Sequence, residues 1–526
     1  MRARAVRLWG LGLIGALATG GDVAWADDPL RSTTDSWTRD DAAHLLRRAG
    51  FGGTPEEIDR LHALGKAAAV DRLVGYEQFK ANFEPPSILP YEPPAFMKEG
   101  PLSPEERQEV IRIRRQNTIV QAQNLCEWWL RRMITTPRPL EEKLVLFWHG
   151  HFTSGLREVE QPRFLYDQNE LFRRYAKGSF GTLTKAVSYD PAMLRYLDGV
   201  NNVASHPNEN YARELLELFT MGPGAFSEND VKSVARAFTG WTINRATGTL
   251  EFQEKEHDYG FKPLFGQFRR YNGVEVVDPI LAQPATAKFI ARKLWVYFAG
   301  TEPDAALLNA LANVLRGSGY KIDVLLRKMF LSDAFYAPQV RFQAVKSPAE
   351  LIAGTYRALE IRPLNANAMV AAMRRMGHEL FQPPNVKGWD GGVKWVNTST
   401  LLERYNFATV PLYGADAPRE GEMMQRMMQD TPGGMAIAQR DANLDQPPYD
   451  PLPVLERYDL RTPEQVVDHY VKRLLQQEIP DDQRAALVAH LREHEIHRWD
   501  TPKEAVAAAV RGLIHLIIST PEYQVQ

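Results

Sequence analysis

Signals that start helices recur along this chain, and they constrain its fold more than any other feature. Segments 54–57 (TPEE) and 103–106 (SPEE) each combine an N-cap side chain, a proline in the first turn and an acidic residue three positions after the cap. Apolar residues follow at helical spacing, and residues 103 to about 135 could form a single long helix. The sequence therefore predicts a mainly α-helical protein.

Strand signals are confined to one part of the sequence. Residues 249–252 and 273–277 are rich in β-branched and apolar side chains, which is typical of short strands. Beyond residue 26, the sequence contains no alternating βαβα pattern, GxGxxG sequence or P-loop, so it carries no nucleotide cofactor motif there. We predict a multi-helix body with a small irregular or β insertion around residues 242–278.

Composition narrows the function classes. The 526 residues include 63 Lys and Arg against 65 Asp and Glu, and this formal net charge of −2 argues against a dedicated nucleic-acid binder. The single cysteine, Cys126, excludes an intrachain disulfide and a zinc site built from several thiolates. The composition does not exclude a divalent-metal cofactor that is held by histidine and carboxylate ligands.

The N-terminal segment, residues 1–26, has the form of a secretory signal peptide. Three arginines precede a short apolar stretch, and Ala24-Trp25-Ala26 matches the small-x-small pattern of a cleavage site. The stretch is shorter than the ~20 residues that a membrane-spanning helix needs, and no later segment is apolar enough to span. An uncleaved membrane anchor is the alternative. We expect cleavage after Ala26 and a periplasmic or secreted mature protein.

The rest of the chain is predicted to form one helical body with an interruption. Residues 27–411 would form the main body, and residues 412–453, which are rich in methionine and proline, a long connection. Residues 454–526 contain three predicted helices. We expect these C-terminal helices to pack on the main body, and a separate subdomain is the alternative.

Two histidines flank a glycine at the end of an apolar segment that begins at Leu140. His149 and His151 could together bind a divalent metal or act as an acid–base pair. Alternatively, one imidazole packs against Trp148 while the other caps the end of the helix.

A polar helix face is predicted within residues 207–222. Its charged and amide side chains fall in an arc of about 140°, opposite an apolar face: Glu209, Asn210, Arg213, Glu214 and Glu217. This density of carboxylates indicates catalysis or metal binding, with Glu214 as the third metal ligand beside His149 and His151. The alternative is a solvated face with Glu209–Arg213 and Arg213–Glu217 ion pairs.

His257 directly precedes Asp258 in the predicted insertion. A carboxylate next to a histidine could orient the imidazole and raise its basicity, as catalytic and metal-supporting histidines require. A solvated loop is the alternative, because the side chains of adjacent residues often point apart.

A loop at residues 382–392 (QPPNVKGWDGG) begins with two prolines and ends with two glycines. The candidate residues for binding a ligand or partner lie in and after this loop: Asn385, Lys387, Trp389, Asp390 and Arg404. An exposed tryptophan and lysine could stack on and hydrogen-bond to a sugar or another planar ligand. Alternatively, the tryptophans of this region fill the core.

Several sequence blocks together resemble the bacterial family DUF1800, whose function is unknown. They are HLLRRAGFGGTPEEI, FWHGHF, NENYARELLELFTMG, DVKSVARAFTGW, ATAKFIARKLWVYFAG, KSPAELI, PPNVKGW and STPEYQVQ, in the order typical of the family. The resemblance implies an exported, mainly helical protein, often encoded beside a second exported family, DUF1501, which resembles sulfatases and alkaline phosphatases. It implies no established reaction.

This chain departs from the family pattern at two places. Family members commonly carry Asn at the position of Gly150, and a Gln is usual near His378, ahead of Phe381. The glycine removes one amide that could serve as a ligand between His149 and His151, but it leaves both imidazoles.

Two function classes follow. In the first, which we favour, the polar groups form a buried network that fixes the helices, and the protein is a non-catalytic binding protein that acts with a DUF1501-type partner. In the second, six residues converge in one cleft for metal-assisted or acid–base hydrolysis of an extracytoplasmic substrate: His149, His151, Glu209, Arg213, Glu214 and His257. The loop at 382–392 fits either class.

Overall fold

The computed structural model describes residues 28–33, 36–93, 103–364, 366–414, 446–494 and 502–526. The predicted signal peptide, residues 1–26, and most of the predicted connection at 412–453 lie outside these ranges. Within the described ranges, no helix is long and apolar enough to cross a membrane.

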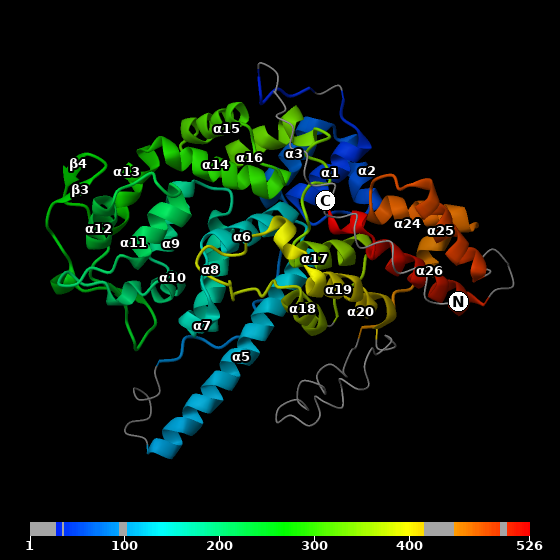
Figure 1. Ribbon diagram of the computed structural model, residues 1–526. Helices are drawn as coiled ribbons and strands as arrows, with labels where there is room; N and C mark the ends of the chain where they lie inside the picture. Colours follow the sequence, from blue (N-terminus) through cyan, green and yellow to red (C-terminus); the bar gives the residue numbers. More distant parts are fainter. Residues whose placement is uncertain (1–27, 34–35, 94–102, 365, 415–445, 495–501) are drawn as a thin grey trace.

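The prediction of a mainly α-helical protein is confirmed (Figure 1). The first half of the chain contains α1 (Arg39–Ala49), α2 (Pro55–Ala63), α3 (Lys66–Val74), α5 (Pro104–Thr135), α6 (Pro139–His151), α7 (Leu156–Val159), α8 (Pro162–Tyr175), α9 (Phe180–Ser188), α10 (Pro191–Tyr196), α11 (Asn210–Glu214) and α12 (Glu228–Ala237). A π-helix, η3 (Leu215–Thr220), directly continues α11.

The second half is also built from helices. It contains α13 (Val277–Ala282), α14 (Pro284–Ala299), α15 (Ala305–Gly317), α16 (Ile322–Leu331), α17 (Pro348–Ala358), α18 (Ala366–Arg375), α19 (Thr398–Asn406), α20 (Thr409–Tyr413), α23 (Leu452–Arg457), α24 (Pro463–Leu474), α25 (Asp481–Glu493) and α26 (Lys503–Ile518). Short 3-10 turns join them, among them η4 (Glu254–Glu256), η5 (Gly273–Val276), η6 (Asp333–Tyr336) and η7 (Gly392–Trp395).

The capping signals identified in the sequence start helices as predicted. The side chains of Thr54 and Ser103 accept hydrogen bonds from the N–H groups of Glu57 and Glu106, and both glutamates complete a capping box. The second signal opens α5, which runs unbroken to Thr135. Figure 1 shows its first half projecting from the body. Its buried residues begin only at Leu125, so the second half anchors the helix.

The small β insertion consists of two antiparallel hairpins. Strand β1 (Trp241–Ile243) pairs with β2 (Leu250–Phe252), and β3 (Lys262–Leu264) pairs with β4 (Gln267–Arg269). The predicted strand at 249–252 is therefore confirmed, but the one at 273–277 is wrong. Asn272 and Glu275 form a capping box there that starts the helical turn η5 and leads into α13. Local capping thus outweighs the β propensity of the valines.

The C-terminal helices contact the main body. Helix α24 packs against α17 and α26 against α20, and their apolar residues belong to the same buried cluster as those of the main body. The Nε of Arg473 donates to the carbonyl of Ala358, and residues 524–526 pair with 344–346 through an antiparallel bridge at Val345 and Val525. These contacts bring the last described residues to the centre of the molecule (Figure 1).

A buried ion network fixes α6 between α5 and α8. The carboxylate of Glu142 on α6 is fully buried and accepts hydrogen bonds from Arg132 Nε (2.5 Å), Arg173 Nε (2.8 Å) and Trp129 Nε1 (3.0 Å). Burial alone would raise the pKa of Glu142, but the two arginines lower it below its usual range. The carboxylate is therefore charged and joins three helices.

Replacing Glu142 tests this network. Glu142→Gln should lower the free energy of unfolding by about 3–5 kcal/mol, because it removes the fully buried carboxylate that Arg132 and Arg173 share. Glu170→Gln is the matched control, since Glu170 pairs with the same Arg173 at 2.6 Å but its side chain is 34% exposed, and it should cost about 1 kcal/mol or less. Urea unfolding measures both, and equal losses would contradict the role of Glu142.

Candidate functional site

His149 and His151 lie in the last turn of α6, on different faces of the helix. Both are buried, with 1% and 2% of their surface exposed. The ring of His149 contacts Trp129 and Phe381, with ring centroids 5.1 and 5.0 Å apart. The ring of His151 lies among the phenylalanines of the core, including Phe152 at 4.5 Å. Two positions along a helix separate side chains by roughly 200°, which explains the different surroundings.

The two imidazoles bond to backbone groups of different segments. His149 Nε2 accepts a hydrogen bond from the N–H of Phe381 (3.1 Å), so its proton is on Nδ1. His151 Nε2 donates to the carbonyl of Phe219 in η3 (2.9 Å), so its proton is on Nε2. Burial lowers the pKa of His149 to about 3 and that of His151 well below its usual value. Both side chains are therefore neutral and each already has a partner within the chain.

The segment after Phe381 lies directly on the end of α6. The hydroxyl of Thr153 donates to the carbonyl of Val386 (2.6 Å), and the N–H of Leu156 donates to the carbonyl of Phe381 (2.8 Å). Gly388 adopts φ +83° and approaches the carbonyl of Gly150 so closely that a Cβ at position 388 would lie 2.5 Å from its oxygen. Only glycine fits there. The two motifs that the sequence analysis treated separately thus meet in space.

Another buried histidine, His378, joins this contact. Its ring centroid lies 4.8 Å from that of Trp389 and 4.9 Å from that of Trp395, and Trp389 lies 5.6 Å from His149. We call His149, His378, Trp389 and Trp395 the His–Trp cluster. Burial lowers the pKa of His378 to about 4. Sequence reasoning did not propose His378 as a site residue, since a lone histidine carries no signal before the loop is folded over it.

Arg404 lies on the buried side of the loop and is not part of its exposed surface. It is fully buried, and its guanidinium donates to the carbonyls of Lys346 (2.7 Å) and Trp395 (3.3 Å) and to Oε1 of Gln524 (3.3 Å). Burial lowers the pKa of Arg404 to about 10. The prediction that Arg404 contacts a ligand is corrected: its donors are used to hold the loop and residue 524 together.

The exposed part of the loop carries charge. Lys387 and Lys394 bind opposite oxygens of Asp390, at 2.9 and 2.8 Å, and the side chains of both lysines are 68% exposed. Hydrogen bonds from the two lysines lower the pKa of Asp390 to about 2. Asn385 is also exposed and accepts the N–H of Lys387 through its side chain. Trp389 and Trp395 are half-buried, so the tryptophans fill the base while the charged residues face solvent.

The predicted acidic helix changes geometry in its middle. Residues 215–220 are π-helical, which alters the angular spacing on which the predicted polar arc rests. Arg213 pairs with Glu209 at 3.1 Å as predicted, but its other partner is Glu228 at 2.7 Å rather than Glu217. These pairs lie at the surface.

Glu214 is the exception on this helix. It is half-buried, and burial raises its pKa, followed by the charge of Glu217. It also lies close enough to Tyr196 to raise the pKa of that phenol, after burial and Glu158. Tyr196 in turn bonds to Thr153 beneath the loop. Glu214 and Thr153 thus both influence the phenol of Tyr196.

His257 is not part of this arrangement. It is buried in the insertion, where its Nδ1 donates to the carbonyl of Thr239 (2.8 Å). The predicted His257–Asp258 pair is wrong, because Asp258 binds Arg236 at 2.6 Å. The ring of His257 contacts those of Phe252 and Tyr259 of the same insertion.

The predicted metal ligands do not assemble. Among the residues with described coordinates, no three His, Cys, Asp or Glu side chains form a group that could hold a metal ion. For His149 and His151 the physical reason is that each Nε2 is already bonded to a backbone group. The structure therefore does not bring His149, His151 and Glu214 into one ligand shell.

The buried imidazoles predict a specific pH dependence of stability. An imidazole with a pKa of about 6.5 in the unfolded chain and about 4 in the fold (His378) or about 3 (His149) binds its proton preferentially in the unfolded state. Stability should thus be complete above pH ~7 and fall as the pH drops, by about 1 kcal/mol per imidazole between pH 7 and 5.5.

Urea unfolding of the wild type and of His378→Gln at both pH values tests this. The variant should lose about 1 kcal/mol less than the wild type over this interval, because its side chain does not titrate. His206→Gln, at an exposed position, should behave as the wild type does. An unchanged pH dependence in His378→Gln would contradict the neutral buried state.

Comparison with known proteins agrees with the sequence blocks. The family model described as "Protein of unknown function (DUF1800)" matches residues 44–525. No curated protein and no solved structure is detectably similar to the chain. Since the match covers nearly the whole chain, the protein belongs to the DUF1800 family.

Proposed function

We propose that this DUF1800 protein is a non-catalytic binding protein. Its contact surface is the exposed part of residues 382–397, which comprise the loop at 382–392 and the residues that follow it up to α19. One observation carries the proposal: the imidazoles of the predicted active site are buried, neutral and bonded to the chain itself. A general base needs access to the proton that it removes, and these side chains lack it. His149 instead holds the residue before the loop on α6, and His151 holds η3 there.

The loop has the properties of a docking surface. Its base is fixed by the His–Trp cluster, by Arg404 and by Thr153, so little conformational entropy would be lost on binding. Its exposed part presents two lysines around one aspartate, beside Val393, which is 58% exposed. A rigidly held apolar side chain surrounded by net positive charge complements a partner surface that has a small hollow with acidic residues around it.

We further propose that the partner is an exported protein of the DUF1501 type and that this chain is exported with it. The signal-like residues 1–26 and the family resemblance support this pairing. The mature protein would then be periplasmic or secreted.

Charge reversal in the loop tests the partner proposal. Lys387→Glu/Lys394→Glu should weaken binding to an exported DUF1501-type protein of the same organism by tenfold or more, because it replaces two attractive charges by repulsive ones. Lys321→Glu/Lys328→Glu makes the same change in net charge at exposed positions of and next to α16 and should bind normally. Calorimetry on the purified pair measures both. Equal binding by the two variants would remove the loop from the interface.

Export has a separate test. The mature chain recovered from the extracytoplasmic fraction should begin at Asp27, as measured by intact mass, and Ala26→Tyr should block cleavage because the peptidase accepts small residues at that position. A chain that begins at Met1 in the cytoplasm would contradict export.

An acid–base hydrolase is the second candidate, and Glu214 is the observation that favours it. A half-buried carboxylate with a raised pKa is the kind of group that acts as a general acid. It influences the phenol of Tyr196, whereas Arg213 and Glu209 pair at the surface and His257 lies in the insertion. The binding proposal is stronger because it accounts for both buried histidines.

A further inference from the structure

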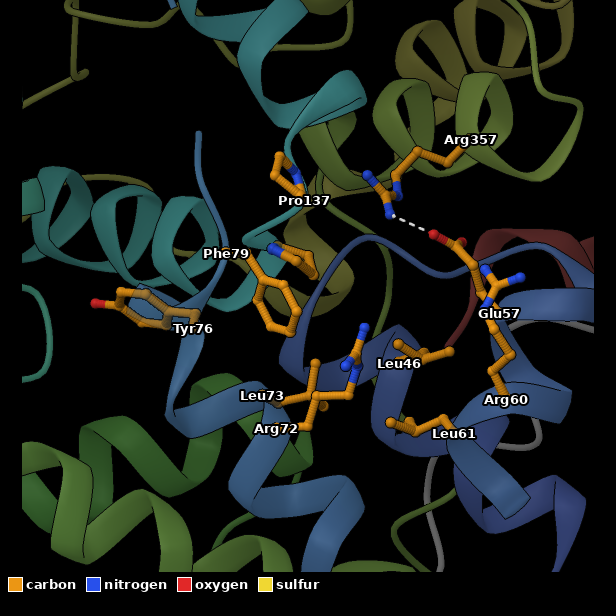
Figure 2. A pocket seen from close by; sticks show the side chains of 11 residues that line it. Leu46, Glu57, Arg60, Leu61, Arg72, Leu73, Tyr76, Phe79, Pro137 and Arg357 are labelled. Atoms are coloured by element: carbon orange, nitrogen blue, oxygen red, sulfur yellow. Dashed lines mark hydrogen bonds and ion pairs between the residues drawn. The ribbon is translucent and has the colours of Figure 1, made fainter. Parts of the chain in front are cut away.

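A pocket opens between the N-terminal helices and the start of α6, away from the His–Trp cluster (Figure 2). Its walls come from α1, α2, α3, α17 and the segment before α6, and it encloses about 110 Å³. The floor is apolar: Leu46, Leu61, Leu73, Phe79, Pro137 and Pro139. This volume suits a ligand smaller than those that fill sites of ~300–1,000 Å³, and a mainly apolar lining is typical of small-molecule sites.

Three arginines and one glutamate supply its charge. Arg60, Arg72 and Arg357 line the pocket together with Glu57, and Figure 2 shows them around the apolar side chains. Glu57 is already engaged twice, since its Oε2 accepts the N–H of Thr54 and its Oε1 pairs with Arg357 at 3.4 Å. The pocket therefore carries two positive charges that Glu57 does not balance.

The guanidinium of Arg357 has an unused donor although its side chain is only 10% exposed. It donates through its terminal nitrogens to the carbonyls of Ile134 and Thr136, but its Nε has no hydrogen-bond partner in the described part of the chain. Burial lowers the pKa of Arg357. A buried donor without a partner costs free energy, so the contacts of this guanidinium within the chain are incomplete.

Unlike Arg357, the other two arginines form no ion pair with an acidic side chain within the described ranges. Arg72 stacks over the ring of Phe79 at 4.4 Å, and Arg60 forms no ion pair with a described residue. The nearest acids in sequence are used elsewhere: Asp59 binds Arg39 and Asp71 binds Arg327, both at 2.6 Å. The positive charges of Arg60 and Arg72 are thus not balanced by the acidic residues next to them in the sequence.

We propose that this pocket binds a small organic anion, with its carboxylate or phosphate among the three arginines and its apolar body on the floor of leucines, prolines and Phe79. Guanidinium groups bind both kinds of oxyanion through paired N–H donors. The apolar floor requires more than a free ion, because burying it against hydrocarbon contributes about 25 cal/mol per Å². A neutral ligand would leave the excess positive charge unbalanced.

Calorimetry with chosen probes tests the proposal on the full chain. Phenylacetate and phenyl phosphate carry the two head groups on the same ring, phenylacetamide lacks the charge, and inorganic phosphate lacks the apolar body. We expect at least one ring-bearing anion to bind, and to bind at least tenfold more tightly than phenylacetamide and inorganic phosphate. The stronger of the two anions identifies the head group.

Variants keep the result specific to this pocket. Arg60→Gln/Arg72→Gln should weaken anion binding at least tenfold, and it should fold normally because both residues are exposed. Arg292→Gln/Arg484→Gln makes the same charge change at an exposed position on α14 and a half-buried one on α25 and should bind as the wild type does. Two results would overturn the proposal. One is that neither ring-bearing anion binds at 10 mM, which would put the Kd roughly above the weakest useful affinities. The other is equal anion binding by the two double variants.

Discussion

Two adjacent buried charges on α6 join this central helix to the helices packed around it. Glu142 pairs with arginines of α5 and α8, and the next residue, Lys143, pairs with Glu350 of α17. Both side chains are fully buried, so each would cost free energy without its partner. Burial lowers the pKa of Lys143 to about 8, while Lys143 and Arg48 bring that of Glu350 to about 2 despite its burial. α6 is therefore tied to α5, α8 and α17, and the pair with α17 joins residues 207 positions apart.

The rigidity of α6 gives its two ends their properties. At its C-terminal end, His149 and His151 reach Phe381 and Phe219, so that the loop at 382–397 and the π-helix η3 are both held against the same turn. The histidines are neutral, which suits them to accept or donate one backbone hydrogen bond in an apolar place. At its N-terminal end, Pro139 forms part of the arginine-lined pocket. One buried helix thus supports both of the surfaces proposed to bind other molecules.

The two surfaces differ in what they can recognise. The loop carries its lysines and Val393 outward, which suits the broad surface of another protein. The pocket turns its arginines around a concave apolar floor, which suits a small ligand. Because the two surfaces lie at opposite ends of α6, ligand binding in the pocket and partner binding at the loop are separable in experiments.

The sequence alone determined where several helices and one strand of this protein form. Capping boxes at Thr54 and Ser103 start helices where predicted, and the strand at 249–252 is present, because both depend on residues within one or two turns of each other. Only the tertiary structure decided the roles of the polar residues. His149 and His151 resemble metal ligands until Phe381 and Phe219 occupy them, and Arg404 resembles a surface arginine until residues 346 and 524 surround it. The physical reason is that hydrogen-bond partners and burial come from segments up to hundreds of residues away, and no local pattern encodes which of them will be adjacent.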